Sequence, residues 1–368
     1  MGFSEHLDNL PFLKTIISFV SNFILKIIRR ISQIGSSNQT NLVIISLHKL
    51  GDTVFTFPVV EEIVRRNPNR KIIILCYDSS KDLYEKFFRV EVETLNRGNF
   101  FLNDRIAKSG ARKKLRKLEP AILYDITGVM TSASLIFNSS SSQIIGTNRD
   151  IFRSIYSKYN TIENVKYSSD IYLKAVGIKS NENSYKFEIK AKYDKSYHIL
   201  IHPFAGWNSK EWNFNKYIEL CLKLNNVHKC AFLIQEGSLN KSRIKYLDSQ
   251  GITIILTRST NDLMQEINKC SLLISNDTGP IQIAAIMGKP TFTIYGPTNP
   301  LFHLPRGNGH RFIIHKIKCS PQGNERLCYT YGGKNGCFSF ECLNLLQVNE
   351  VFASIKSFLE DLEIQGQK

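Results

Sequence analysis

The chain has 368 residues, which is long for one compact domain and sufficient for two. Apolar residues make up 42% and charged residues 22%, values typical of a soluble globular protein that exclude a disordered chain. Lysine and arginine total 48 against 32 aspartates and glutamates, so the net charge of +16 favours anionic lipid, phosphorylated substrates or nucleic acid as partners. Because no recognition-helix pair, zinc-finger spacing or aromatic RNA-binding signature accompanies this charge, a nucleic acid partner is not expected.

The segment 1–40 stands apart from the rest of the chain. A helix is predicted over Phe12–Ile31, because its apolar residues recur with the spacing of one helical face. The uncharged stretch between Lys14 and Lys26 is too short to cross a hydrocarbon core of about 30 Å. Two interpretations remain open: an in-plane helix whose cations meet anionic headgroups, or a helix that packs its apolar face on its own domain. The cations near the end of the helix favour the membrane.

The predicted location is the cytoplasm. The first residues carry no basic segment, and no small-residue cleavage site follows the apolar run, so no secretory signal is expected. Cys76, Cys221, Cys230 and Cys270 fall in apolar or helical stretches and are interpreted as buried thiols. A reducing cytoplasmic setting follows, with peripheral attachment to the inner face of the cytoplasmic membrane as an option.

From Asn41 onward, short β-branched runs alternate with helical stretches, which is the pattern of parallel sheets covered on both faces. The pattern pauses at Lys190–Tyr197, a candidate interdomain hinge, and then restarts. It predicts two doubly wound α/β domains, 41–190 and 191–347, followed by a C-terminal helix and tail in 348–368. The expected strands are Leu42–Leu47, Lys71–Cys76, Ala121–Asp125, Gln143–Ile145, His198–His202, Cys230–Gln235, Thr253–Leu256, Leu272–Ser275 and Thr291–Tyr295, and the expected helices are Thr53–Arg66, Phe214–Leu224, Asn261–Lys269, Gly279–Met287 and Val348–Leu362.

The first candidate loop follows the first strand of the 41–190 domain and contains Gly51 and Asp52. Gly51 permits a tight turn or a close backbone approach, and Asp52 sits where a helix is expected to begin. A helix N-cap is a common role for aspartate at such a position, and a general base facing a cleft is the functional alternative. Spacing alone favours the cap.

The second loop follows the first strand of the 191–347 domain and leads to Lys210 and Trp212. Ala205 and Gly206 leave room for a phosphate near the backbone, and Lys210 can neutralise that phosphate as a point charge. The alternative is an exposed loop with a surface lysine and a packed tryptophan.

In the third loop an apolar strand runs directly into Asp277, Thr278 and Gly279, and a helix rich in small residues follows. The N–H groups at the start of that helix, together with its dipole, form a site suited to a diphosphate. The alternative is an ordinary helix capped by Asp277. The Gly279-Pro280 pair and the small residues Ala284 and Ala285 favour the functional interpretation.

Taken in order, these loops resemble glycosyltransferase family 9, the heptosyltransferase family of bacterial lipopolysaccharide synthesis. The resemblance covers Asn41–Ile355, and only the ordered set of motifs is specific. Its elements are Leu50-Gly51-Asp52-Thr53-Val54 with Pro58, Lys210-Glu211-Trp212, Asp277-Thr278-Gly279-Pro280, Gly288-Lys289-Pro290 and Tyr295-Gly296-Pro297-Thr298-Asn299-Pro300.

The resemblance implies a GT-B fold: two Rossmann-like domains facing a cleft, the first binding the acceptor and the second the nucleotide-sugar donor. It implies an inverting transfer without metal or cofactor, with Asp52 as the base, which reverses the preference for a cap. Lys210 then contacts the donor phosphate, and Asp277, Thr278 and Gly279 form the donor-binding turn. The implied donor is a nucleotide-diphosphate sugar, with ADP-heptose favoured, and the implied acceptor is a lipopolysaccharide core or another glycolipid or glycan.

One position departs from the family pattern. Where the family commonly has a histidine shortly after its Asp-Thr-Gly turn, this chain has Gln282. Glutamine can hydrogen-bond a phosphate or a sugar, but it cannot carry a positive charge. We therefore place Gln282 among the expected donor-binding residues.

Four further cysteines, Cys319, Cys328, Cys337 and Cys342, fall close together near the C-terminus. Four thiolates can hold a structural zinc ion, but no close Cys-x2-Cys pair is present, so packed thiols or adventitious disulfides are favoured and no metal is expected. Two alternative functions stay open: a GT-B-like nucleotide-sugar epimerase, and a non-catalytic nucleotide-sugar-binding protein at a membrane surface. A nicotinamide-dependent oxidoreductase is excluded, because no Gly-x-Gly-x-x-Gly follows either opening strand.

Overall fold

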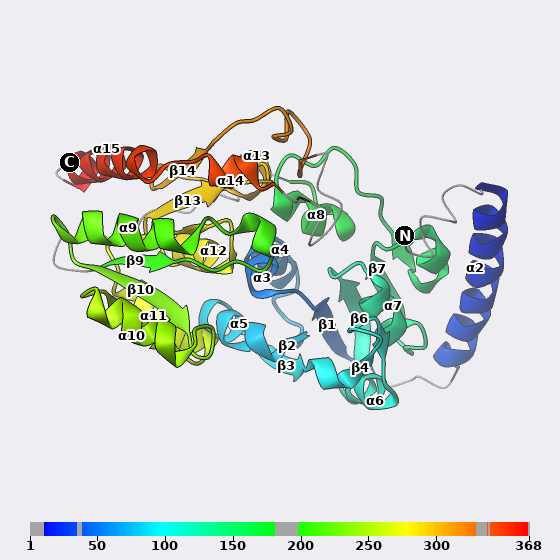
Figure 1. Ribbon diagram of the computed structural model, residues 1–368. Coiled ribbons are helices and arrows are strands. Elements are labelled where there is room, and N and C mark those ends of the chain that lie inside the picture. The colour runs from blue at the N-terminus through cyan, green and yellow to red at the C-terminus, as the bar shows by residue number, and fades with distance from the viewer. Residues whose placement is uncertain (1–10, 35–38, 181–197, 329–336, 338, 367–368) are drawn as a thin grey trace. The chain divides into compact units, whose positions relative to one another are not determined.

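The computed structural model describes residues 11–34, 39–180, 198–328, 337 and 339–366. Residue contacts divide the chain into two compact units, each built around one sheet with helices against it (Figure 1). The first unit comprises Met1–Lys49, Phe55–Val165 and Ser169–Ser180, and the second comprises Leu50–Val54, Lys166–Ser168 and Asn181–Lys368. The predicted hinge at 190–197 lies outside the described residues.

In the described part of the first unit, a six-stranded parallel sheet has the order β3-β2-β1-β6-β7-β8, and a short hairpin β4-β5 lies apart from it. Its strands are β1 Asn41–Ser46, β2 Ile72–Tyr77, β3 Glu91–Leu95, β4 Phe100–Phe101, β5 Ile106–Ala107, β6 Pro120–Asp125, β7 Gln143–Gly146 and β8 Lys158–Tyr159. The helices along this part of the chain are α2 Pro11–Gln33, α3 Leu50–Phe55, α4 Phe57–Arg66, η1 Asp78–Ser80, α5 Lys81–Phe87, η2 Arg97–Asn99, α6 Ser109–Lys117, α7 Met130–Ile136, η3 Asp150–Ile155 and α8 Ser168–Ala175.

The second unit repeats this sheet order among its described residues, as β11-β10-β9-β12-β13-β14, and every pair is parallel. Its strands are β9 Ile199–His202, β10 Cys230–Gln235, β11 Thr253–Thr257, β12 Leu272–Asn276, β13 Thr291–Tyr295 and β14 His310–Ile314. Its helices are η5 Asn208–Lys210, α9 Phe214–Asn225, α10 Lys241–Ser249, α11 Thr260–Asn268, α12 Gly279–Ile286, α13 Pro300–His303, α14 Glu341–Asn344 and α15 Val348–Gly366. The prediction of two Rossmann-like sheets is confirmed.

Each sheet reverses direction at its centre, where the first strand lies between the second and the fourth of its sheet. The chain moves outward through β2 and β3, returns to β6 beside β1, and then moves outward on the other side. The second sheet does the same at β9 and β12. Loops that leave the two central strands diverge, which opens a crevice at their carboxyl ends, the usual ligand position in such sheets.

The core of the second unit forms against one face of its sheet. Buried residues of α9, α10 and α15 pack there against β9, β10 and β12. The helix α12 packs on β12 and β13, and its residues from Pro280 to Ile286 are buried, as expected for a helix in which Gln282 is the one polar side chain. A helix fixed in this way holds its first turn rigidly at the end of β12.

The helix predicted over Thr53–Arg66 is incorrect in one respect. The chain forms two helices, α3 and α4, separated at Thr56. Pro58 lies in the first turn of α4, where its missing N–H is tolerated, and the Thr56 hydroxyl lies 2.7 Å from that of the buried Tyr84. Because α3 begins at Leu50, Asp52 lies inside the first turn and is exposed, so it does not occupy the N-cap position.

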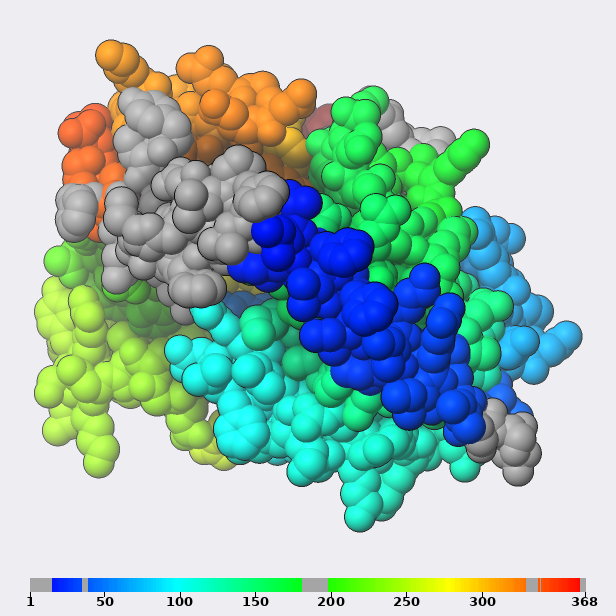
Figure 2. Space-filling view, turned by 90° about the vertical axis from the view of Figure 1, so that its right-hand side faces the viewer, coloured from blue at the N-terminus to red at the C-terminus, as the bar shows by residue number. Residues whose placement is uncertain are grey.

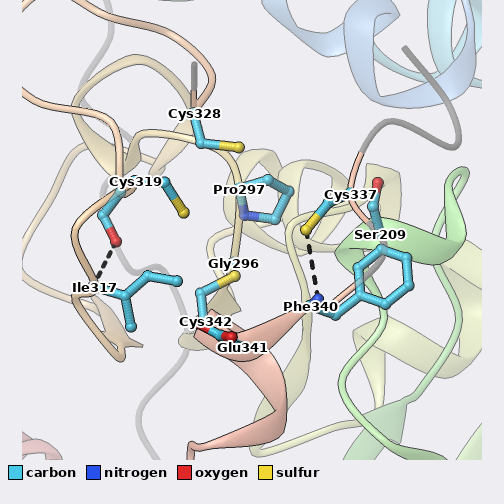
Figure 3. Close-up of a pocket in the computed structure, with 11 residues that line it drawn as sticks. Ser209, Gly296, Pro297, Ile317, Cys319, Cys328, Cys337, Phe340, Glu341 and Cys342 are labelled. Atoms are coloured by element: carbon cyan, nitrogen blue, oxygen red, sulfur yellow. Dashed lines mark hydrogen bonds between the residues drawn. The ribbon is translucent and has the colours of Figure 1, made fainter. Parts of the chain in front are cut away.

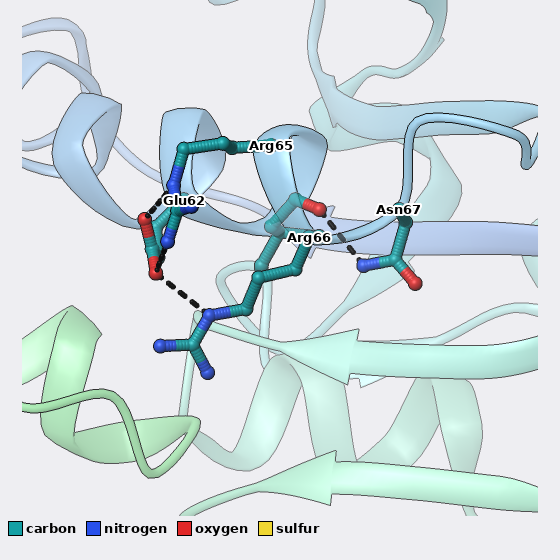
Figure 4. A network of polar contacts seen from close by, with 5 residues as sticks. Glu62, Arg65, Arg66 and Asn67 are labelled. Carbon is teal, nitrogen blue, oxygen red and sulfur yellow. Dashed lines mark hydrogen bonds and ion pairs between the residues drawn. The ribbon is translucent and has the colours of Figure 1, made fainter.

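The end of α4 is fixed by a network of polar contacts (Figure 4). Glu62 accepts hydrogen bonds from Arg65 and Arg66 at 2.6–2.8 Å, and these bonds lower its pKa to about 2. The Asn67 amide donates to the Ile63 carbonyl at 2.8 Å, satisfying a carbonyl of the last turn. The helix therefore stops before the next strand, β2.

The buried carboxylate of Asp125, at the end of β6, organises the loop that follows. Tyr156 and Ser132 donate their hydroxyls to it at 2.7 and 2.8 Å, and the backbone N–H groups of Thr127 and Gly128 donate at 3.0 and 3.1 Å. Burial raises the pKa of Asp125 to about 6, although these hydrogen bonds act to lower it. The loop is thereby held in one conformation.

This loop in turn fixes the one that follows β1. The Thr127 hydroxyl accepts a hydrogen bond from the Leu47 N–H at 2.9 Å and donates to the Ile45 carbonyl at 3.1 Å. The His48 ring lies 3.1 Å from the Ile126 carbonyl and meets Tyr172 edge-on. The chain therefore enters α3, which carries Asp52, from a constrained position.

The helix α2, Pro11–Gln33, confirms the predicted amphipathic helix. It lies on η3 of its own unit, and its apolar side is the exposed one, so the alternative in which the apolar face packs on the domain is incorrect. Within the described residues, no helix has both the length and the apolar character of a transmembrane span.

A stability prediction follows from Gly146, at the end of β7. A Cβ at this position would lie 2.6 Å from the Asp125 carbonyl oxygen, a backbone atom that cannot move aside. Gly146→Ala should therefore lower the free energy of unfolding by about 1–3 kcal/mol in urea titrations. The matched control is Gly110→Ala in α6, where a Cβ meets nothing within 4 Å, and which should raise it by about 0.4–1 kcal/mol. Equal behaviour of the two variants would contradict the packing seen at Gly146.

Candidate functional site

The loop after β9 is held against the end of β12 by the buried Asn276. Its amide donates to the Pro203 carbonyl at 2.7 Å, and its oxygen accepts from the Trp212 N–H at 2.9 Å. Within the loop, the Glu211 carboxylate accepts from the Ala205 N–H at 2.8 Å. The turn η5, which ends at Lys210, is thus fixed beside the end of β12.

Lys210 and Asp277 form a buried ion pair. Their Nζ and Oδ2 atoms lie 2.7 Å apart, with side-chain exposures of 16% and 8%. Thr298, after β13, donates its hydroxyl to the same oxygen at 2.8 Å. Burial alone would raise the pKa of Asp277, but the charge of Lys210, assisted by His303 and Thr298, brings it down to about 2. The ammonium also lies 4.7 Å from the centre of the Trp207 ring.

The first turn of α12 follows directly. Its N-cap residue is Thr278 in an extended conformation, and the Thr278 side chain makes no capping hydrogen bond. Asp277 is not the cap, because its carboxylate is directed to Lys210 and Thr298. The small residues Ala284 and Ala285 are buried, as the sequence predicts for a helix close to its sheet.

Gly51 and Gly279 bring the starts of α3 and α12 together inside the second unit, to which Leu50–Val54 belongs. A Cβ on Gly51 would lie 3.1 Å from the Gly279 Cα, and one on Gly279 would lie 3.0 Å from the Gly51 nitrogen. Any side chain at either position would separate two backbones. Asp52 therefore stands in the first turn of α3, next to the point where this turn touches the donor-binding turn predicted from sequence.

Gln282 lies in α12, and its side chain is buried. Its amide donates to the His303 carbonyl at 2.7 Å, and its Oε1 has no hydrogen-bond partner among the described residues. Gly206, by contrast, is exposed, and a Cβ there would meet nothing within 4 Å. The predicted space at Gly206 is present, although no steric contact requires a glycine there.

Three residues of the site were not predicted as such: Thr298, His303 and Asn276. Burial lowers the pKa of His303, and the charges of Asp277 and Asp52 offset this only in part. The His303 Nδ1 lies 3.1 Å from the Ser168 hydroxyl. Thr298 belongs to the Tyr295–Pro300 motif, which carried the family resemblance. Nothing in its sequence signal indicates that it binds Asp277.

The four C-terminal cysteines line one small cavity of about 10 Å³ (Figure 3). All four are free thiols, which agrees with the alternative of packed thiols and not with that of disulfides. Burial, and then the neighbouring thiols, raise the pKa of Cys342 to about 12. Among the described residues, no three His, Cys, Asp or Glu side chains are arranged to hold a metal ion, and the expectation of no metal stays a prediction.

The chain matches the family model described as glycosyltransferase family 9 (heptosyltransferase) over residues 111–329, more than half of its length. It is similar to lipooligosaccharide heptosyltransferase 2 of Campylobacter jejuni, with 23% identity over 289 residues, 74% of this chain and 86% of that protein.

Solved structures share the fold. The family 9 glycosyl transferase of Veillonella parvula aligns with a TM-score of 0.70 and 16% identity, covering 88% of this chain and 99% of that one. The E. coli heptosyltransferase WaaC with ADP aligns with a TM-score of 0.62 and 17% identity, over 86% and 99%. These alignments confirm the expected GT-B fold. With the family match, they establish that the chain belongs to glycosyltransferase family 9, the heptosyltransferase family, and is a glycosyltransferase.

Proposed function

We propose that this enzyme moves heptose or a related sugar from ADP-heptose to a lipopolysaccharide core or another glycolipid or glycan acceptor, with inversion at the anomeric carbon. In this proposal 41–190 binds the acceptor and 191–347 the donor, at the cytoplasmic face of the membrane. The names of similar proteins support the donor: one solved relative is the E. coli heptosyltransferase WaaC with ADP-2-deoxy-2-fluoro heptose, and a second is TibC with ADP-D-beta-D-heptose.

The observation that carries the proposal is the backbone contact between Gly51 and Gly279. It brings an exposed carboxylate, Asp52, to the first turn of α12, beside which Lys210 is held by Asp277. A base, a fixed cation and a helix start are the groups that a displacement at a sugar diphosphate needs.

In the proposed mechanism, Asp52 removes the proton of an acceptor hydroxyl while that oxygen attacks the anomeric carbon. The bond from this carbon to the diphosphate breaks, and negative charge grows on the departing phosphate. Lys210 and the N–H groups at the start of α12 stabilise that charge, and they need no reorganisation because both are already fixed.

Within this mechanism Asp277 is a positioning residue. Its carboxylate would repel a phosphate at close range, whereas its ion pair with Lys210 orients the ammonium. Thr278 and Gly279 contribute the backbone at the start of α12. The unpaired Oε1 of Gln282 can accept a hydrogen bond from a hydroxyl, so we assign Gln282 to the sugar rather than to the phosphate.

The proposed donor is tested by thermal stabilisation with ADP, UDP and GDP, followed by turnover. ADP at 100 times its Kd should stabilise the protein by about 2.7 kcal/mol, and the other two should stabilise it less at the same concentration. ADP-heptose with a deacylated core glycan should then release ADP only when the glycan is present. Isomerised donor without acceptor would point to an epimerase, and stabilisation without turnover would point to a binding protein.

The proposed base is tested by Asp52→Asn. The amide has the shape of the carboxylate but is not a base, so transfer should fall by about 10²–10⁴-fold while the Kd for ADP stays unchanged. The matched control is Asp82→Asn, since Asp82 also lies in the first turn of a helix, α5. It should transfer at the parent rate. Near-parent turnover in Asp52→Asn would remove Asp52 from the chemistry.

The proposed phosphate contact is tested by calorimetric titration of ADP. Lys210→Ala should weaken ADP binding by about ten- to a hundredfold, which corresponds to a charge-assisted contact of roughly 1.5–3 kcal/mol. The loss of affinity should be smaller at high salt, because salt screens the charge of Lys210. Thr278→Ala should weaken ADP binding less than Lys210→Ala does, because the backbone N–H groups and the helix dipole remain.

Lys210→Ala leaves a buried carboxylate unpaired and can unfold the second unit, so a second variant is needed. Lys210→Met/Asp277→Asn removes both charges together and should fold, yet still bind ADP weakly. If this double variant binds ADP like the parent at both salt concentrations, Lys210 does not contact the donor.

A further inference from the structure

The helix α2 is attached to its unit through its polar side. Asn22 donates its amide to the Asp150 carbonyl at 2.7 Å and accepts from the Ser154 N–H at 2.7 Å, and Ser21 donates to the Ile151 carbonyl at 2.8 Å. These contacts fix one side of α2 along η3.

Two turns later, Arg29 completes this attachment. Its guanidinium donates to the carbonyls of Ser139 and Ser141 and is buried, and burial lowers its pKa. Leu25 of α2 is partly buried and packs against the core of the unit. The docked side is therefore mainly polar, the reverse of an ordinary surface helix.

The opposite side of α2 is an exposed apolar stripe. Phe19 is 73% exposed and Phe23 59%, and both lie on the helix face that η3 does not cover. Single exposed apolar residues are common on soluble proteins, but a continuous row along a helix marks an interaction surface. The stripe comprises Ile16, Ile17, Phe19, Val20, Phe23, Ile24, Ile27, Ile31 and Ile34.

Figure 2 shows α2 lying along the surface of its unit. The exposed apolar residues run from Ile16 to Ile31, so the stripe extends along most of the helix. Lys26 and Arg30 are also exposed and, by helical spacing, border the stripe on one side. Their long stems can lie along apolar surface while their charges reach outward. A continuous apolar row with cations at its edge is the pattern of a helix that lies in the plane of a membrane surface.

We propose that the α2 stripe is a membrane-binding surface that inserts in-plane into a bilayer containing anionic lipid. The partner must be apolar within and negative at its surface, which matches the stripe and its bordering cations. A second copy of the chain fits less well, because each copy carries a net charge of +16 and the same bordering cations. Membrane binding by α2 is independent of the proposed function, except that a glycolipid acceptor would give it a purpose.

The test is flotation of the full chain with vesicles of phosphatidylethanolamine and phosphatidylglycerol. The parent should float with these vesicles and much less with phosphatidylcholine alone. Phe23→Glu should reduce the bound fraction by about tenfold or more, because it places a charge in the stripe that inserts into the bilayer. The matched control is Phe101→Glu: Phe101 is 56% exposed in the same unit but belongs to β4 and not to α2, and its variant should float like the parent.

The charge border is tested separately. Lys26→Gln/Arg30→Gln should weaken flotation, and more at low salt than at high salt. Lys113→Gln/Lys117→Gln removes the same charge from the exposed side of α6 and should float like the parent. Equal losses in both pairs would mean that net charge, not the stripe, draws the protein to the vesicles, and would overturn the proposal.

Two further readouts complete the experiment. Sedimentation equilibrium without vesicles should give the same mass for the parent and Phe23→Glu; a parent oligomer that this change dissociates would make the stripe a subunit interface and overturn the proposal. Transfer to a deacylated, water-soluble acceptor should be unchanged in Phe23→Glu. If the parent itself shows no transfer to this acceptor, the proposed function is wrong, but the vesicle experiment still tests membrane binding.

Discussion

The second unit depends on one buried ion pair, Lys210 with Asp277. The carboxylate also accepts the Thr298 hydroxyl, so one side chain connects the loops that follow β9, β12 and β13. Removing a single partner from such a pair leaves an uncompensated charge, which destabilises by about 3–5 kcal/mol. The sequence between these strands can therefore vary only if it keeps the ammonium, the carboxylate and the hydroxyl within reach of one another.

The same pair bears on the chemistry, because a cation that is already fixed loses little freedom when an anion arrives. Lys210 is restrained by Asp277 on one side and by the Trp207 ring on another. A phosphate that approaches must share the ammonium with the carboxylate. The phosphate is therefore bound less tightly, but by an ammonium whose position is fixed. An enzyme that must also release a nucleoside diphosphate benefits from that compromise, since transition-state stabilisation matters more than tight ground-state binding.

The central strands could be predicted from sequence, and the edges could not. The strands β1, β9 and β12 are continuous apolar runs with few other interpretations. The edge strand β3 carries Glu91 and Glu93 and was not predicted, because an edge facing solvent tolerates charge and loses the apolar signal. The break between α3 and α4 was also not predicted, since Pro58 fits equally well in the first turn of a new helix.

For the candidate site, sequence order suggested which loops matter but not what each residue contacts. Asp277 looked like a helix cap or a ligand for the donor, and the structure shows it bound to Lys210, which lies far from it in sequence. The sequence around Thr298 and His303 does not indicate what these residues contact, because their contacts depend on how β13 and α13 pack. The orientation of α2 could not be predicted either: the apolar spacing defines a face, but the hydrogen bonds of Ser21, Asn22 and Arg29 to distant backbone groups decide which face turns inward.

The polar docking of α2 has a consequence for how this helix leaves its unit. Ordinary surface helices expose apolar area when they detach, and that exposure gives unfolding its heat capacity change and its sensitivity to denaturant. Undocking α2 exposes chiefly Arg29, Asn22, Ser21 and the carbonyls they bind, while the apolar stripe is already in contact with solvent. Release of α2 would therefore add little to the heat capacity change or to the denaturant sensitivity, so local opening of α2 would depend only weakly on denaturant while the sheet beneath stays intact.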